Sequence, residues 1–310
     1  MPGKNKNWLS RLFFHQITLA VLGFLILLFV NLMLAVSLYP IIRMGQLSIG
    51  HAAFMAIGAY TSTLLVMKIG LSFWLSLLAG GVMAAIVALL VGSLTLRIKG
   101  LFFVVITFGI NEIVRLFIVF GPDILGGSAG IPNVPHPDLI AIPGLLVIDF
   151  ASRVPWYYLS LILALITIFV IYNIDRSRIG RTYRAIDQND MLAESIGINL
   201  MGYKVTIFTI GCFFAGIAGS LFAHYYSVVT PDEFTIWKSI YLVIYIQVGG
   251  LASIAGPIAG TVLLNAVDEI FRFSGTCQPL IYGAILVLVI LFLPEGILGL
   301  PSALGRISRR

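Results

Sequence analysis

Charged residues are scarce in this chain. They make up 10% of its 310 residues, against about 25% in an average soluble domain, whereas 59% are hydrophobic and the mean hydropathy is +1.04. Hydrophobic runs of about twenty residues recur, and each is long enough to cross a bilayer. The alternating segments of a membrane β-barrel are absent. The composition therefore predicts an all-α, polytopic transmembrane helical bundle that forms a single domain over residues 1–310.

Motifs for nucleotide or metal binding are also lacking. Neither the Gly-x-x-x-x-Gly-Lys-Ser/Thr loop nor the His-Glu-x-x-His zinc pattern occurs. The two cysteines, Cys212 and Cys277, are far apart and lie in or beside apolar segments, which predicts packed small side chains rather than a disulfide or metal site. We therefore predict that this chain is not an enzyme, has no catalytic residue, and binds no metal or cofactor. Any ATP and Mg²⁺ that drive its function must be bound by another chain.

Nine apolar segments are candidate membrane spans, and we expect eight to ten helices in all. The seventh is too short to cross alone, which favours a discontinuous element. The segments are Ile17–Tyr39, His51–Met67, Phe73–Leu96, Leu101–Phe120, Trp156–Ile174, Tyr203–Tyr226, Trp237–Val248, Gly256–Phe271 and Pro279–Leu293.

Basic residues concentrate in the loop from Asp175 to Lys204. Lys and Arg in a short loop between spans mark the cytoplasmic side, so this loop is predicted inside and residues 121–155 outside. Because successive spans alternate in direction, the C-terminal tail, which carries three arginines, is also predicted inside. A single first span would place the basic N-terminus outside, against the rule, and the sequence leaves that end undecided. The net charge of +6 therefore indicates membrane orientation and no nucleic-acid partner.

The basic loop contains the signals of a short helix. Asp187 or Asn189 is a suitable N-cap, Asp190 falls in the first turn, and Gly197 is suited to end the helix. Its apolar residues are Met191, Leu192 and Ile196. Because so short a helix cannot bury this face by itself, we expect either the membrane surface or a cytosolic partner to cover it.

Two glycine-rich passages resemble each other at a constant offset. Gly45-Gln46-Leu47-Ser48-Ile49-Gly50-His51 pairs with Gly250-Leu251-Ala252-Ser253-Ile254-Ala255-Gly256, matching Gly45 with Gly250 and Ser48 with Ser253. The topology makes both run outward, which predicts internal parallel repeats. A helix that is interrupted at glycine leaves backbone groups free to face a polar lumen, and small residues let helices approach closely. We therefore expect discontinuous helices here and assign a translocation pathway to Gly45, Gln46, Ser48, His51, Gly250 and Ser253. For His51 the alternative is a packing histidine that donates to a backbone carbonyl.

The segment 121–155 is rich in glycine and proline and too long for a simple connector. It is interpreted as an ordered external cap, or as a surface that receives a partner or lines the substrate entrance. Two charged pairs, Glu112 with Arg115 and Asp268 with Arg272, have helical spacing near predicted outer helix ends.

The stretch RTYRAIDQNDMLAESIGINLMGYK, at 181–204, resembles the cytoplasmic coupling loop of permease subunits in bacterial branched-chain amino acid ABC transporters. The passage GQLSIGHAAFMAIGAY from Gly45, the Gly249–Pro257 stretch and Pro294–Gly299 are similar to the same family. The general importer motif is degenerate here, since Met191 stands at its Glu position and Thr209-Ile210 replace Leu-Pro.

This resemblance implies a heterodimer with a second homologous permease, two cytoplasmic ATPases, an extracytoplasmic binding protein, and a place in the bacterial inner membrane. It implies that the coupling loop contacts the ATPases and that Arg115 and Arg272 seat the binding protein. The coupling residues would be Arg181, Arg184, Asp187, Asp190, Ala193 and Gly197. Urea or short amides are alternative substrates, because permeases for these compounds are similar in the same regions. A stand-alone secondary carrier is a different possibility, although the early spans lack the mid-membrane acid that carriers use.

Overall fold

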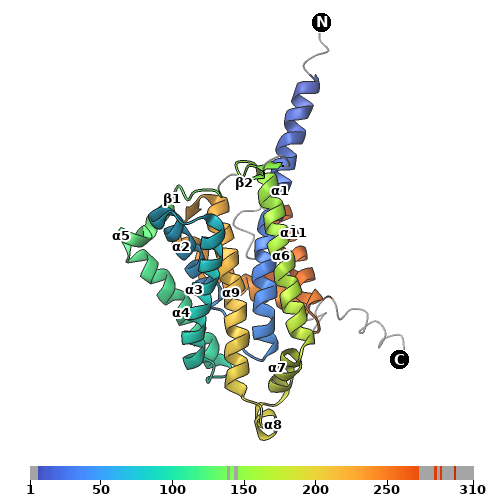
Figure 1. The fold of residues 1–310 in the computed structure, drawn as a ribbon. Helices are drawn as coiled ribbons and strands as arrows, with labels where there is room; N and C mark the ends of the chain where they lie inside the picture. Colours follow the sequence, from blue (N-terminus) through green and yellow to red (C-terminus); the bar gives the residue numbers. More distant parts are fainter. Residues whose placement is uncertain are drawn as a thin grey trace, which may run out of the picture.

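The computed structural model is a bundle of long helices with a small irregular cap at one end (Figure 1). It describes residues 6–137, 140–142 and 146–271, with positions 283, 284, 287 and 297. The long helices are α1 (Lys6–Arg43), α2 (His51–Ile69), α3 (Phe73–Thr95), α4 (Leu101–Val119), α6 (Arg153–Arg176) and α9 (Leu200–Tyr226). The shorter helices are α5 (Pro122–Leu125), α7 (Arg178–Gln188), α8 (Asp190–Ser195), α10 (Ile236–Gly249) and α11 (Ala255–Phe271).

Six helices of the described part are long and apolar enough to cross a membrane: α1 from Thr18 onward, α2, α3, α4, α6 and α9. The predicted all-α polytopic bundle is therefore confirmed. The predicted segment Trp237–Val248 falls in α10, which is apolar but has only 14 residues. The last predicted span, Pro279–Leu293, and Cys277 lie outside the continuously described residues.

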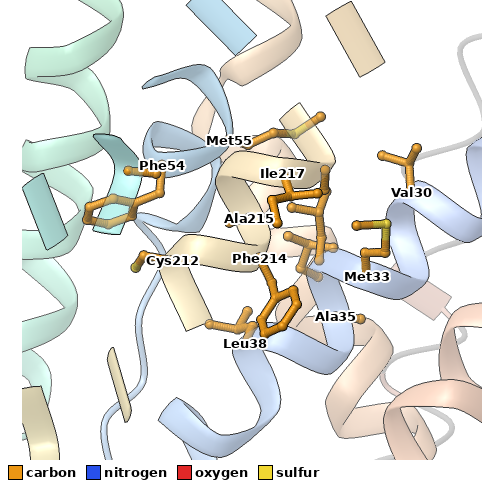
Figure 2. Packing of buried hydrophobic residues seen from close by; sticks show 14 of the residues in the cluster. Val30, Met33, Ala35, Leu38, Phe54, Met55, Cys212, Phe214, Ala215 and Ile217 are labelled. Atoms are coloured by element: carbon orange, nitrogen blue, oxygen red, sulfur yellow. The ribbon is translucent and has the colours of Figure 1, made fainter. Parts of the chain in front are cut away.

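Helix α9 occupies the centre of the bundle (Figure 1). It packs against α1, α2 and α3, and 72% of the residues in its most apolar stretch are buried. Figure 2 shows Cys212, Phe214, Ala215 and Ile217 of α9 among buried residues of α1 and α2. Cys212 is fully buried and free, which confirms its interpretation as a packed side chain.

Glycines let these central helices approach to backbone contact. A Cβ atom added at Gly58 of α2 would overlap the backbone of Gly216 in α9, and one at Gly219 would overlap the Met55 carbonyl oxygen. On the other side of α9, a Cβ at Gly211 would lie 2.6 Å from the Ser37 carbonyl oxygen of α1. Membrane helices gain little from hydrophobic exclusion, so close van der Waals packing of this kind is what holds them together.

Short strands and turns cap one end of the bundle. Strand β1 (Ile131–Pro132) pairs with β4 (Val228–Val229), β2 (Ile140–Ile142) pairs with β3 (Leu146–Ile148), and the 3₁₀ helices are η1 (Gly127–Ala129) and η2 (Pro231–Phe234). His224 at the end of α9 donates from Nδ1 to the Pro135 carbonyl oxygen at 2.7 Å, which fixes the cap to the bundle. The segment 121–155 is thus ordered in its described part.

The start of α1 lies at the capped end, opposite α8 (Figure 1). One first span therefore leads from the N-terminal end of α1 to the α8 end. Following the orientation predicted from the basic loop, we call the α8 end the inner end and the capped end the outer end.

Candidate functional site

The inner loop folds into two helices rather than the single helix that was predicted. Ser177 caps α7, since its Oγ accepts from the Ile179 amide at 3.1 Å. Asn189 caps α8 in the same way, accepting from the Leu192 amide at 3.1 Å. The predicted end at Gly197 is also present. Its φ of +84° is left-handed, and the Ile198 amide donates back to the Ala193 carbonyl as in a Schellman motif.

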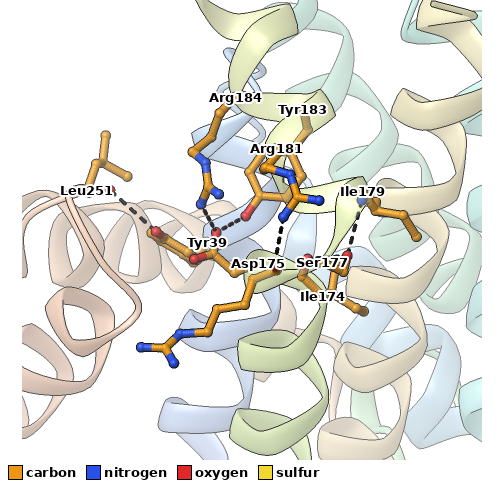
Figure 3. A network of polar contacts seen from close by, with 10 residues as sticks. Tyr39, Ile174, Asp175, Ser177, Ile179, Arg181, Tyr183, Arg184 and Leu251 are labelled. Atoms are coloured by element: carbon orange, nitrogen blue, oxygen red, sulfur yellow. Dashed lines mark hydrogen bonds and ion pairs between the residues drawn. The ribbon is translucent and has the colours of Figure 1, made fainter.

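The missed helix α7 had a readable signal. Ile179, Tyr183 and Ile186 recur at helical spacing behind the Ser177 cap, and the last two are buried. Tyr183 donates to the Asp175 carboxylate, and Arg184 pairs with the same carboxylate at 3.0 Å (Figure 3). These bonds hold α7 against the end of α6. Burial and the hydrogen bond to Asp175 raise the pKa of Tyr183.

Asp190 is held by two lysines from different parts of the chain. Lys204, in the second turn of α9, donates from Nζ to Asp190 Oδ2 at 3.0 Å. Lys99, in the connection between α3 and α4, pairs with the same oxygen. The Lys204 side chain is 4% exposed and that of Lys99 is 58% exposed. We call these three residues the Asp190 triad.

The electrostatics of the two loop carboxylates differ. Although burial opposes it, hydrogen bonds from Lys99 and Lys204 lower the pKa of Asp190 below its ordinary value. For Asp187, burial raises the pKa despite the lowering effect of nearby Arg43. Asp190 is thus a stabilised anion, whereas ionised Asp187 is disfavoured by its surroundings.

The loop and the first glycine-rich passage meet in one cavity. Its volume is about 340 Å³, and it lies between the end of α1, the end of α7 and the start of α8. Its walls include Gly45, Gln46, Asp187, Asp190, Lys99 and Lys204. Two residues assigned to the pathway and two assigned to the coupling loop are therefore brought together, which the sequence did not predict.

The first glycine-rich passage is a helix break inside the bundle. Helix α1 ends at Arg43 and α2 begins at His51, while Gln46, Ser48 and Gly50 between them are buried. Thr107, in the second turn of α4, accepts a 3.2 Å hydrogen bond from the Ile49 amide through its side chain. The non-helical backbone is thus satisfied in part by neighbouring helices, as the membrane interior requires.

His51 lies fully buried at the start of α2. Its Nε2 is 2.9 Å from the Ser37 hydroxyl of α1, so its described partner is a side chain rather than the backbone carbonyl that was the alternative. Its Nδ1 has no hydrogen-bond partner in the described part of the chain.

The second passage is also a break, between α10 and α11, but its surroundings differ. Gly250 has a left-handed φ of +101°, as Gly45 has one of +82°. Ser48 is buried, whereas Ser253 is exposed. Within the described residues neither hydroxyl bonds to another helix, and Ser48 accepts only from the nearby Gly50 amide at 3.4 Å. Helices α10 and α11 pack directly through Gly249, Gly256 and Gly260. Their close approach leaves no room there for a bridging side chain.

Helix α8 presents its apolar side chains outward. Met191 is 81% exposed, Leu192 63% and Ile196 72%. Ala193 faces the opposite way and is buried, and Arg181 and Gly197 are exposed. The predicted apolar face therefore exists at the inner tip of the bundle, and Ala193 anchors α8 to its own chain instead of contributing to that face.

Near the outer end, Arg115 of α4 forms an ion pair with Glu112, with Nε 3.0 Å from Oε1. This confirms the predicted pairing at i,i+3. Both side chains are partly exposed. Arg272 lies outside the described residues, as does the Pro294–Gly299 stretch apart from position 297.

Comparison with known proteins gives a consistent result. Residues 20–293 match the family model described as "Branched-chain amino acid transport system / permease component". The chain is 33% identical to the high-affinity branched-chain amino acid transport system permease protein LivM of Escherichia coli K12 over 82% of its length and 64% of that protein. It is 26% identical to LivH of the same strain, over 83% of this chain and 87% of LivH. It is 28% identical to the guanosine ABC transporter permease protein NupQ of Bacillus subtilis, over 58% of this chain and 59% of NupQ.

The matched region thus spans less than two thirds of LivM. No solved structure matches the chain significantly.

Proposed function

Because the chain belongs to the family of permease components of branched-chain amino acid transport systems, we propose that it is the permease subunit of an ABC importer for branched-chain amino acids. It spans the inner membrane several times and works as a transport subunit. ATP and Mg²⁺ bind to separate ATPase subunits, and this chain supplies the route through the bilayer. The C-terminal tail lies in the cytoplasm.

The observation that carries this proposal is the exposed apolar face of α8. Three large apolar side chains, two on the six-residue α8 and Ile196 directly after it, are costly to leave in water, which marks an interaction site. Ion pairs made by other residues of the inner loop hold α7 and α8 in place and leave this face open. Arg184 is fixed by Asp175 and Asp190 by two lysines. An ATPase with an apolar cleft fits this surface.

A second permease is the expected partner within the membrane. Two proteins of one strain, LivM and LivH, both match more than four fifths of this chain, which indicates a system with two related permeases. We propose a heterodimer with substrate passing at the interface, two ATPases below it, and a binding protein above it. Arg115 would help to seat the binding protein, since charges at the rim of an interface mainly set the association rate.

The glycine breaks are proposed to adjoin the pathway. Gly45, Gln46 and Ser48 lie in the non-helical stretch between α1 and α2 that begins at the inner cavity, and the buried His51 starts α2. Gly250 and Ser253 form the corresponding break of α10 and α11. The few fixed charges in the span interiors suit a zwitterion with no net charge.

Uptake by reconstituted proteoliposomes tests this function. The complex of both permeases, both ATPases and the binding protein should import radiolabelled leucine only when ATP is inside and the binding protein outside. Unlabelled isoleucine and valine should compete, whereas urea, acetamide and guanosine should not. Uptake of urea, an amide or guanosine in place of leucine would replace the substrate assignment. ATP-independent uptake by this chain alone would contradict the importer.

A further inference from the structure

We propose that Asp190 is a positioning residue that ties α8 to the membrane helices and so transmits the movement of α8 to the pathway. The inference rests on the proposed function, because an ATPase must move α8 for the tie to matter. What is new is the assignment of the transmission to one carboxylate and two lysines.

The contacts of α8 make Asp190 its main polar anchor. Among the side chains of α8, only Ala193 is buried, and those of Met191, Leu192, Glu194 and Ser195 are exposed. Asp190 is the residue of this helix that forms ion pairs within the described structure, and both reach the same oxygen, Oδ2. The helix is thus attached at its first turn and free at its apolar face.

The two lysines connect this anchor to different helices. Lys204 belongs to α9, so the 3.0 Å bond joins α8 to the most buried helix of the bundle. Lys99 belongs to the connection that ends α3 and begins α4, so its ion pair joins α8 to two further helices. A displacement of Asp190 therefore acts on the inner ends of α3, α4 and α9 together.

The packing of the bundle can transmit such a displacement from the inner end toward the outer end. Helix α9 meets α1, α2 and α3 at Gly211, Gly216 and Gly219, where an added Cβ atom would lie within 3 Å of the neighbouring helix's backbone. Close-packed contacts of this kind shift as units instead of deforming gradually. The helix break at Gly45 and Gln46 lines the same cavity as the Asp190 triad, so the proposed pathway lies directly beside these ion pairs.

The two ion pairs also differ in a way that permits a clean test. Lys204 is buried, so removing Asp190 alone leaves an unpaired charge that destabilises the fold. Replacing both partners removes that penalty. Lys99 is mostly exposed, and loss of an exposed ion pair has little effect on stability.

The test uses Lys99→Met and the double variant Asp190→Asn with Lys204→Met in the full complex. Glu194→Gln, an exposed acid on the same helix, is the matched control. We expect both triad variants to melt near the wild-type temperature and to hydrolyse ATP, while leucine imported per ATP falls by about five-fold or more in the double variant. Lys99→Met should show a smaller loss, and Glu194→Gln should show none.

A second readout does not depend on transport. In the purified permease, amide hydrogen exchange at residues 190–198 should be faster in both triad variants than in wild type and unchanged in Glu194→Gln, because α8 is then less firmly held.

Unchanged transport per ATP in the double variant would overturn the proposal, and so would a parallel loss of hydrolysis and transport with a lower melting temperature, which indicates structural support only. A wild-type complex with no ATP-driven uptake would instead reject the proposed function. In that case the exchange rates alone would decide whether Asp190 holds α8.

Discussion

Gly58 of α2 and Gly216 of α9 face each other at backbone contact, closer than any side chain permits. A Cβ atom at Gly58 would overlap the carbonyl oxygen and Cα of Gly216. Gly80 of α3 joins the same contact, since a Cβ there would lie 2.7 Å from the Gly58 carbonyl oxygen. Three helices thus meet at one point of the bundle, where the Ser220 hydroxyl of α9 also donates to the Gly58 carbonyl oxygen at 3.0 Å.

Substitution at this contact should be destabilising. We expect Gly58→Ala or Gly216→Ala to lower the free energy of unfolding by about 1–3 kcal/mol, because overpacked atoms must push backbones apart. Gly109 of α4 is the control, since it has open space around it. Gly109→Ala should leave stability unchanged or raise it by up to about 1 kcal/mol through helix propensity. Melting curves in detergent measure these differences, and equal melting temperatures for all three variants would contradict the packing account.

Polar substitutions on the exposed apolar face of α8 should weaken ATPase binding. We expect Leu192→Asp with Ile196→Asp to reduce co-purification of the ATPase at least ten-fold, since buried charges without partners are costly at an interface. The permease alone should keep its melting temperature, because both side chains are exposed. Ala193→Arg should instead destabilise the permease itself, because Ala193 is buried. Full ATPase recovery with the double aspartate variant would remove α8 from the interface.

Asp187 should make stability depend on pH. Its folded-state pKa is raised, so its contribution to stability is fully present below the unfolded pKa of about 3.9 and is lost as pH rises through the folded pKa. We therefore expect Asp187→Asn to raise the melting temperature at pH 7, with the difference shrinking as pH falls toward 4. Asp190→Asn should act in the opposite direction at pH 7, since its pKa is lowered. A lower melting temperature for Asp187→Asn at pH 7 would contradict this assignment.

The glycines at the two helix breaks should be needed more for transport than for insertion. At Gly45 a Cβ would lie 2.8 Å from Asp187 Oδ1, and both Gly45 and Gly250 have left-handed φ values. We expect Gly45→Leu or Gly250→Leu to abolish leucine uptake while membrane expression falls by less than about half. Gly70→Leu is the control, since it also has a left-handed φ but no neighbour within 4 Å. A parallel loss of expression and uptake at Gly45 and Gly250 would indicate a packing role only.

The sequence predicted the helices well where composition alone decides. The predicted starts at His51, Phe73 and Leu101 coincide with the starts of α2, α3 and α4, because each apolar run follows a short polar or glycine-rich turn. The cap at Asn189 and the end at Gly197 followed from local hydrogen-bond chemistry. These features depend on residues that are adjacent in the sequence, so one sequence is enough to predict them.

Contacts between distant segments were not predictable in this way. Lys99, Asp190 and Lys204 come from three elements, and nothing in their spacing brings them together. The same holds for the contact between His51 and Ser37, which depends on where the first turn of α2 lies against α1. Ser48 and Ser253 match in sequence yet differ in burial, which depends on the helices that pack around each break.

Photo-crosslinking from α8 tests most directly whether this helix is the contact that links ATP hydrolysis to the membrane domain. A benzophenone side chain would replace Ile196 at the inner tip, and in a matched variant would replace Ile124 in α5 near the outer end, where the side chain is also exposed. In a complex that hydrolyses ATP, we expect Ile196 to crosslink to the ATPase and Ile124 not to do so. A complex that hydrolyses ATP normally and yields no ATPase crosslink from position 196 would contradict the account.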